Sequence, residues 1–319
     1  MHISSVAATL VADIIRSGIR IERGAEVGQF TVPDTPSAPI TIELLAKGGG
    51  PRASGLPTMV QCDAYLAAVG RQPNTQHLNL QSVGIDTDEY GGILVDSRLQ
   101  TTIPNVFAAG DVLGRPFLAS TGVAQGRAAI TSMFGSDTDF ATGLVGQCDE
   151  NDAACKVDGI ASAGVSFDPA SLANNPFAFP TGVWTSPEAA YYGLSLQQAK
   201  EAGLDAGEGI ALYAECLRGR VFSPNGLLKL VFDKDNGRIV GVHICGDDAC
   251  ELIHYGMEIV KAQRTIQDLN RSLYSAVTFH ELFKIAAQAA LDEAGARKRR
   301  RAAGAALAKR YRRRSSTQD

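Results

Sequence analysis

The chain has 319 residues, of which 45% are hydrophobic, 20% charged and 7% aromatic, and these proportions exclude a collagen-like or wholly disordered protein. The sequence contains no uninterrupted apolar run of about 18 residues, so it predicts no transmembrane helix. The net charge of −4 is uneven, because residues 297–319 hold ten of the thirty Lys and Arg and a single acid. An acidic body therefore carries a basic tail, and the length predicts two domains or slightly more.

The N-terminal part predicts one helix followed by strands. Apolar residues recur at helical spacing over residues 5–17, and Gly18 is expected to stop this helix. Residues 19–22 alternate like a strand, and residues 40–45 form another strand-like run within a loose β-meander. The apolar run over residues 63–70 is typical of a buried strand.

The middle of the chain predicts short strands, one helix and an insertion. Residues 93–95 and 106–109 are strand-like, and a helix is expected from about Ala119 to Phe134. Residues 139–179 lack clear periodicity and are rich in small and turn-forming residues. We therefore expect a linker or insertion there.

Periodic patterns return from Thr181 onward. Ser195 is a plausible N-cap for a helix that ends before Gly203. Asn236-Gly237 lies between two alternating runs and predicts a β-hairpin. Two further helices are expected over residues 249–261 and 281–290.

The segment Thr101-Thr-Ile-Pro-Asn-Val-Phe-Ala-Ala-Gly-Asp111 carries the clearest chemical signal. We expect a buried strand to present Gly110 and Asp111 at its carboxyl end, where open α/β sheets bind ligands. Gly110 allows close backbone approach to a cofactor, and Asp111 can accept hydrogen bonds from sugar-like hydroxyls. A helix beginning near Leu118 would point its positive end at negative charge.

This segment resembles the second flavin motif of the pyridine nucleotide–disulfide oxidoreductases. The resemblance implies that Asp111, next to Gly110, binds the ribityl chain of FAD, and that Leu118 and Ala119 lie against the flavin pyrimidine edge. Residues 67–74 are similar to the Gly-Arg-x-Pro-Asn segment that closes the nicotinamide domain of that family. Gly70, followed by Arg71, would therefore lie beside bound NAD(P).

A third resemblance, over residues 181–291, is to the dimerisation domain of the same family. It begins at Trp184-Thr-Ser-Pro-Glu188 and implies a homodimer formed through residues 180–295. The implied fold is α/β plus α+β, with partial Rossmann-like FAD/NAD(P)-binding domains before an α+β dimerisation domain. The expected parts are an NAD(P)-binding part (1–78), a second FAD-binding segment (79–138), the insertion (139–179), the dimerisation domain (180–295) and the basic tail (296–319).

Several family features are absent from the 319 residues. No Gly-x-Gly-x-x-Gly loop for a dinucleotide phosphate occurs, so we expect an N-terminally truncated chain. Disulfide reductases of the family carry His-Pro-Thr-x-x-Glu near the C-terminus, whereas Ala276 stands here at the histidine position and Glu281 is retained. This is similar to the FAD-dependent transhydrogenases, which pass hydride between NADPH and NAD⁺ without thiols.

Two alternative functions stay open. One is a disulfide reductase such as dihydrolipoamide dehydrogenase or glutathione reductase, with the displaced His280 and Glu281 as candidate catalytic residues. The other is a non-catalytic dimerisation module. Cys245 and Cys250 are interpreted as packed thiols and not as a redox pair. No Cys/His cluster has zinc spacing, so no metal is expected.

The remaining expectations concern partners and location. NAD(H) and NADP(H) are the implied substrates. The basic tail could bind nucleic acid or act as a nuclear localisation address, but a solvated extension is favoured because Tyr311 is its only aromatic residue. Residues 1–5 resemble neither a signal nor a transit peptide, and the resemblance places the enzyme in the cytoplasm, away from membranes.

Overall fold

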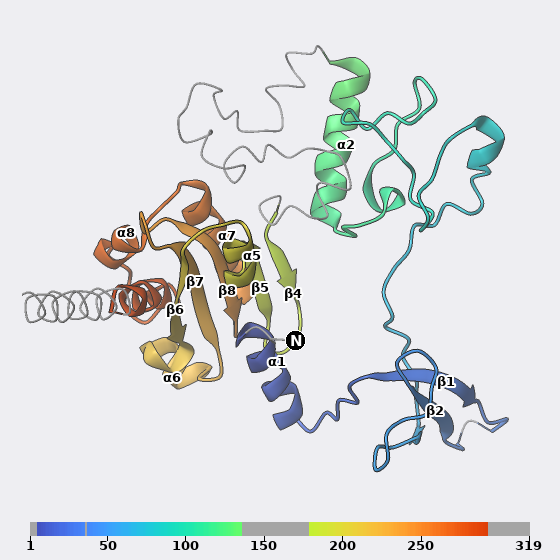
Figure 1. Ribbon diagram of the computed structural model, residues 1–319, viewed down its shortest axis with the longest axis horizontal. Helices are drawn as coiled ribbons and strands as arrows, with labels where there is room; N and C mark the ends of the chain where they lie inside the picture. Colours follow the sequence, from blue (N-terminus) through green and yellow to red (C-terminus); the bar gives the residue numbers. More distant parts are fainter. Residues whose placement is uncertain (1–4, 36, 136–178, 293–319) are drawn as a thin grey trace, which may run out of the picture. The chain divides into compact units, whose positions relative to one another are not determined.

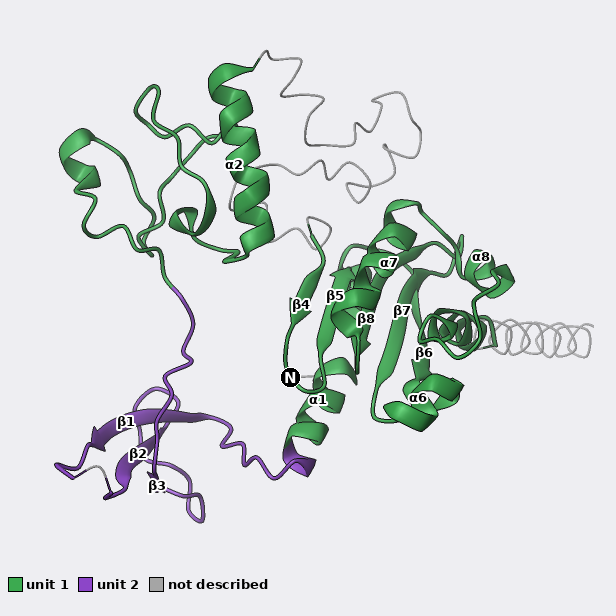
Figure 2. Cartoon of the chain, turned by 180° about the vertical axis from the view of Figure 1, so that it is seen from behind, with its two compact units in different colours: residues 1–14, 72–319 green, residues 15–71 purple. Residues whose placement is uncertain are grey.

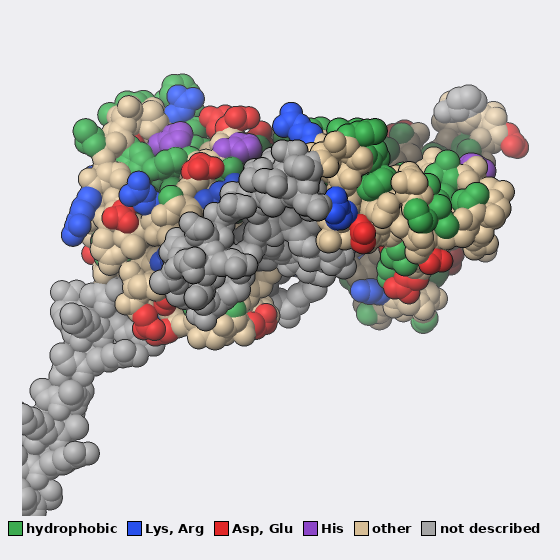
Figure 3. Space-filling view, turned by 90° about the horizontal axis from the view of Figure 1, so that it is seen from above, with side chains coloured by type: hydrophobic (Ala, Val, Ile, Leu, Met, Phe, Trp, Pro, Cys, Tyr) green, Lys and Arg blue, Asp and Glu red, His purple; other side chains and the backbone are tan. Residues whose placement is uncertain are grey.

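The structure is a computed structural model that describes residues 5–35, 37–135 and 179–292. It separates into two compact units, residues 15–71 and the remainder of the chain (Figures 1 and 2). In the described part, no helix is both long and apolar enough to cross a membrane. On the face shown in Figure 3, basic and acidic side chains are interspersed among hydrophobic ones.

Unit 2 is built on a three-stranded antiparallel meander. Helix α1 (Ser5–Arg16) precedes it and confirms the predicted helix to within a residue. Strands β1 (Ala25–Thr31), β2 (Ile40–Ala46) and β3 (Met59–Cys62) pair in chain order. On β2, Ile42 and Leu44 are buried, as the alternating pattern requires.

Two predicted strands in this unit are wrong. Residues 19–22 have no regular structure, because the strand pairing begins only at Ala25. Residues 63–70 have no regular secondary structure and are exposed, and Leu66 and Val69 are 86% and 90% accessible. A buried strand needs neighbours on both sides, and no segment within the described ranges pairs with this one.

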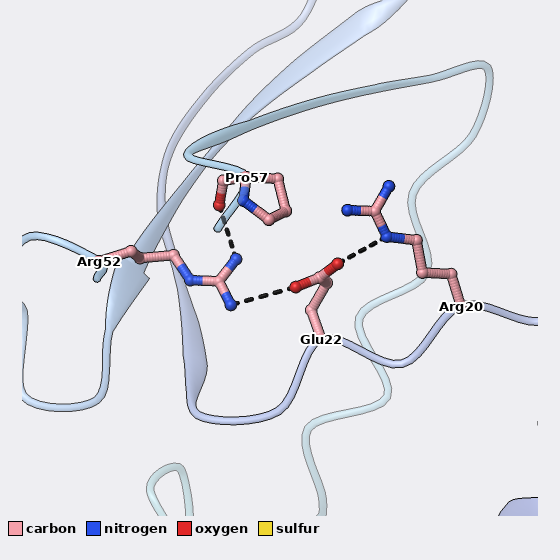
Figure 4. Close-up of polar contacts among 4 residues, drawn as sticks. All are labelled: Arg20, Glu22, Arg52 and Pro57. Atoms are coloured by element: carbon pink, nitrogen blue, oxygen red, sulfur yellow. Dashed lines mark hydrogen bonds and ion pairs between the residues drawn. The ribbon is translucent and has the colours of Figure 1, made fainter. Parts of the chain in front are cut away.

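An ion-pair network ties the chain entering unit 2 to its longest loop (Figure 4). The guanidinium of Arg52 is buried and donates to the Glu22 carboxylate at 3.1 Å and to the Pro57 carbonyl at 2.6 Å. Arg20 donates to the other Glu22 oxygen at 2.6 Å. Arg52, together with Arg20, lowers the pKa of Glu22. These bonds hold residues 20–22 in place without a strand.

Residues 72–135 form a loop-rich segment packed under one helix. It contains two 3₁₀ turns, η1 (Leu80–Val83) and η2 (Gly110–Leu113), and helix α2 (Ala119–Phe134), whose bounds confirm the prediction. The predicted strands at 93–95 and 106–109 are wrong, since each region makes only an isolated bridge. Local Asx turns interrupt the pairing, because the Asp96 carboxylate accepts from two nearby backbone N–H groups. The buried apolar side chains come from both loops and helix: Ile85, Ile93, Leu99, Ala108, Leu113, Ala128 and Ala129.

Residues 180–292 form an antiparallel sheet flanked by helices (Figure 1). The strand order is β4-β5-β8-β7-β6. The strands are β4 (Thr181–Val183), β5 (Ala189–Gly193), β6 (Ala206–Leu212), β7 (Leu227–Asp233) and β8 (Ile239–Cys245). The helices are α5 (Leu196–Glu201), α6 (Leu217–Phe222), α7 (Ala249–Lys261), α8 (Ile266–Arg271) and one over residues 281–292, with a 3₁₀ turn η3 (Tyr213–Glu215) before α6.

Local signals in the sequence account for several of these elements. Ser195 caps α5 through a complete capping box with Gln198. The Asn236-Gly237 turn joins β7 to β8, and α7 has its predicted bounds. The antiparallel sheet with helices confirms the α+β class for this domain.

The main core lies between the sheet and the helices that follow it. Tyr213 is fully buried, and its hydroxyl donates to the Asp247 carbonyl at 2.9 Å. Gly226 and Gly246 pack against its ring, where an added Cβ would come within 2.6 Å and 2.5 Å of ring atoms. The glycines thus make room for one of the two tyrosine side chains buried in this core.

Candidate functional site

The Gly110–Asp111 turn lies at the start of η2. Ala109 is extended and Gly110 has φ 83°, so the chain reverses sharply at a residue without a Cβ. Asp111 follows on the exposed side, and its carboxylate bonds to no residue in the described ranges. A carboxylate of this kind can accept hydrogen bonds from a polyol.

The N-terminus of α2 packs beside this turn. Leu118 is extended and gives α2 no side-chain cap, so first-turn N–H groups near the exposed Ala119 remain for another acceptor. Gly110 and Gly122 lie in close contact, since a Cβ added to Gly122 would be 3.5 Å from the Gly110 Cα. One folded segment thus holds Gly110, Asp111, Leu118 and Ala119, and their role in binding a cofactor stays a prediction.

Two residues at this site were missed by the sequence analysis. Gln125 is 2% exposed, and its Oε1 accepts from the Gly110 N–H at 2.8 Å. Thr121 is 7% exposed, and its hydroxyl has no partner within the described residues. Their spacing of four places two polar residues on the buried face of α2, which is a signal that the sequence does carry.

The arrangement fits a bound flavin. Within the described residues, a carboxylate without a partner, an uncapped helix N-terminus and a buried hydroxyl without a hydrogen bond lie on one segment. A close contact between two glycines lies next to them. Such groups suit a ligand with sugar-like hydroxyls and a polar ring edge. Of the other predicted cofactor residues, Gly70 has φ 112° and is exposed, as is Arg71, and both belong to unit 2.

The two candidate catalytic residues lie at the start of the final helix. The exposed His280 ring is 5.3 Å from the Tyr255 ring, centroid to centroid, and the Tyr255 and Tyr274 hydroxyls are 3.0 Å apart. Glu281 accepts from the Thr278 N–H at 3.3 Å. Its carboxylate thus caps a helix start, and the structure gives it no hydrogen bond to His280.

Val277, in the loop before this helix, has φ 61°, which costs a β-branched residue about 1–2 kcal/mol. We expect Val277→Gly to raise the free energy of unfolding by about 0.5–1 kcal/mol, because the side chain is 44% exposed and little packing is lost. Urea denaturation followed by circular dichroism measures this. The control Val221→Gly, in helix α6, should instead lower it by a similar amount. A lower free energy of unfolding in Val277→Gly would contradict the conclusion that the Val277 backbone is strained.

The C-x₄-C pair behaves as packed thiols. Cys245 is buried and Cys250 partly buried, and both are free. Burial raises the pKa of each to about 11. The backbone of Cys250 makes the specific contact instead: its N–H donates to the Glu188 carboxylate at 2.9 Å, and this carboxylate thereby caps the start of α7. These thiols are therefore poor nucleophiles at neutral pH.

His243 lies on strand β8 of the five-stranded sheet. Its Nε2 lies 3.0 Å from the Leu194 carbonyl, and its ring stacks on Tyr191. Burial, with Lys229 nearby, lowers its pKa to about 4, although the Leu194 bond and Glu208 act the other way. The contacts of His243 are those of a packed side chain, whereas His254 is exposed.

The depressed pKa of His243 predicts acid sensitivity. The unfolded state binds a proton below the ordinary value of 6.5, whereas the folded state resists it to about 4. The contribution of neutral His243 to the free energy of unfolding is therefore fully present above pH 6.5. It is lost as the pH falls toward 4, and the loss is on the order of 2–3 kcal/mol. Urea titrations at several pH values measure this loss. His243→Gln should flatten it, and His254→Gln should not; an equal slope in His243→Gln would contradict the assignment.

Similarity to known proteins shows the family to which this chain belongs. The fold is similar to that of the HOCl-induced flavoprotein disulfide reductase RclA from Escherichia coli, with a TM-score of 0.68 and 21% identity over 89% of this chain and 55% of that one. Two family models also match: pyridine nucleotide-disulphide oxidoreductase at residues 2–126, and its dimerisation domain at residues 179–287. The chain belongs to the pyridine nucleotide-disulphide oxidoreductase family, which uses FAD and NAD(P).

Relatives within the family carry different names. A soluble pyridine nucleotide transhydrogenase of Mycobacterium bovis is 28% identical over 260 residues, which is 81% of this chain and 46% of that protein. The mitochondrial dihydrolipoyl dehydrogenase of Pisum sativum is 30% identical over 244 residues, 76% of this chain and 42% of that protein. The chain thus spans less than half the length of these relatives.

Proposed function

We propose that this protein is an FAD-dependent oxidoreductase that transfers hydride between NADPH and NAD⁺. The observation that carries the proposal is Ala276, which stands where the family's disulfide reductases have the histidine that serves their thiols. Glu281, which would orient that histidine, instead bonds the Thr278 N–H. Hydride exchange between two nicotinamides requires neither group, and a transhydrogenase is among the relatives.

When bound, FAD supplies a flavin that accepts hydride from one nicotinamide and returns it to another. The residues of this chain bind and orient. Asp111 would accept hydrogen bonds from the ribityl hydroxyls, and the start of α2, at Leu118 and Ala119, would offer N–H groups and a positive dipole to the pyrimidine edge. Gly70 and Arg71 serve the NAD(P) side. The positive helix end would stabilise the reduced, electron-rich state of a bound flavin ring.

Other parts of the proposal concern assembly and domain organisation. We place a homodimer contact within residues 180–295, in keeping with the matched dimerisation domain, and the protein in the cytoplasm. Residues 1–78 are assigned to NAD(P) binding and residues 79–138 to FAD. Light scattering on the purified chain tests the dimer, with a monomeric mass as the contradicting result.

Titration with FAD, followed by NADPH and thionicotinamide-NAD⁺, tests the activity. We expect quenching of FAD fluorescence on binding and then formation of the reduced thionicotinamide. A chain that binds no FAD would contradict the proposal and favour a non-catalytic dimerisation module. The same reaction mixture with the protein but without FAD is the blank.

A disulfide reductase is the second candidate, supported by the 30% identity to dihydrolipoyl dehydrogenase. It would use His280 as the acid/base group. The FAD-loaded chain should then oxidise dihydrolipoamide with NAD⁺, and His280→Gln should abolish that reaction. Transhydrogenation that is unchanged in His280→Gln, without dihydrolipoamide oxidation, would exclude this candidate.

A further inference from the structure

The buried amide of Gln125 joins the two elements of the candidate flavin site. Gln125 lies on α2, 2% exposed, and its Oε1 accepts from the Gly110 N–H at 2.8 Å. No other polar side chain in the described residues bonds across the contact between α2 and η2. Burying the amide of a glutamine to this extent costs desolvation free energy, and a hydrogen bond made by the buried amide offsets that cost.

The bond supplies what the turn itself lacks. Ala109, the N-cap of η2, offers no side-chain acceptor, so the first N–H of the turn would otherwise be unsatisfied. Gly110 has φ 83° and no Cβ, and it is the residue of this turn with the most conformational freedom. The Gln125 amide therefore fixes the backbone immediately before Asp111.

The same bond sets the spacing between the two binding elements. Gly110 touches Gly122 through backbone atoms, with no side chain between them to keep the elements apart. Gln125 lies one turn further along the same helix, and its side chain reaches back to Gly110. The glycine contact and this hydrogen bond together hold Asp111 relative to the first turn of α2.

We propose that Gln125 is a positioning residue for the flavin cofactor, acting through Gly110 on Asp111. The proposal rests on the proposed function, since it assumes that Asp111 and the start of α2 bind one FAD. Because Gln125 is 2% exposed, its role is assigned to the backbone bond and not to contact with the cofactor. It keeps the carboxylate and the helix end at the separation that the cofactor needs, before the cofactor arrives.

Three variants of the 319-residue chain test this. Gln125→Met keeps length and volume but cannot accept the Gly110 N–H, and Gln125→Glu keeps an acceptor. Arg127→Met is the matched control on the exposed face of α2. We expect FAD affinity to fall roughly tenfold in Gln125→Met, which is about 1.4 kcal/mol, and to stay within about threefold of wild type in Gln125→Glu and Arg127→Met.

Amide hydrogen exchange at Gly110 without FAD provides a second measurement. Exchange should accelerate in Gln125→Met and stay slow in Gln125→Glu. Wild-type FAD affinity in Gln125→Met would overturn the positioning role, and so would equal losses in the Met and Glu variants. If the wild-type chain binds no FAD, the proposed function fails and the cofactor role fails with it, while exchange at Gly110 still reports whether the bond exists.

Discussion

Replacing Asp111 by Ala is expected to weaken FAD binding by roughly a hundredfold, about 3 kcal/mol. The carboxylate is exposed and has no partner in the described part of the chain, so its acceptor capacity is free for a ligand. A hydrogen bond to a charged group contributes about 1.5–3 kcal/mol, and a ribityl chain offers more than one hydroxyl. Fluorescence titration of FAD with the purified chain measures the change.

Two controls separate binding from folding in this experiment. Asp111→Asn keeps the shape without the charge and should lose part of the affinity. Asp86→Ala removes another exposed carboxylate of the same segment and should leave FAD affinity unchanged. Thermal melting without FAD should be the same for all three variants, because neither the Asp86 nor the Asp111 carboxylate bonds to a described neighbour. Wild-type affinity in Asp111→Ala would refute its role.

Gly241→Ala is expected to lower the free energy of unfolding of the sheet domain by about 3 kcal/mol or more. A Cβ at this position of β8 would lie 2.0 Å from the Leu194 carbonyl oxygen, which is backbone and cannot move by changing a rotamer. Displacing Leu194 would also disturb its N–H bond to the Val240 carbonyl and its contact with His243. The total free energy of unfolding of a typical domain is only about 5–15 kcal/mol.

The control for this substitution is Gly126→Ala on helix α2, where an added Cβ meets nothing within 4 Å. Alanine should there stabilise the helix by about 0.5–1 kcal/mol through its higher helix propensity. Chemical denaturation followed by far-ultraviolet circular dichroism measures both variants. A Gly241→Ala protein within about 1 kcal/mol of wild type would mean that β5 and β8 can separate without loss.

Most of the candidate flavin site could be predicted from the sequence. The position of Asp111 follows from a long motif, and α2 follows from helical periodicity beginning after Leu118. The hydrogen bond of Gln125 could not be predicted, because it joins residues 15 positions apart through a loop of irregular structure. The family motif indicates Glu281, but the bond of its carboxylate to the Thr278 N–H depends on the local backbone conformation.

Local patterns by themselves determined the hairpin and the helices α1, α2, α5 and α7, whereas the short helices α6 and α8 were not predicted. The Asn236-Gly237 turn, the Ser195 cap and the bounds of α7 depend on interactions within a few residues, and those are encoded in short windows. Only the tertiary structure decided whether an apolar run became a strand. Residues 63–70 and β7 are both apolar, but β7 lies between β8 and β6, whereas residues 63–70 have no neighbour in the described chain. A strand is stabilised by the backbone and side chains beside it, and sequence alone does not supply those partners.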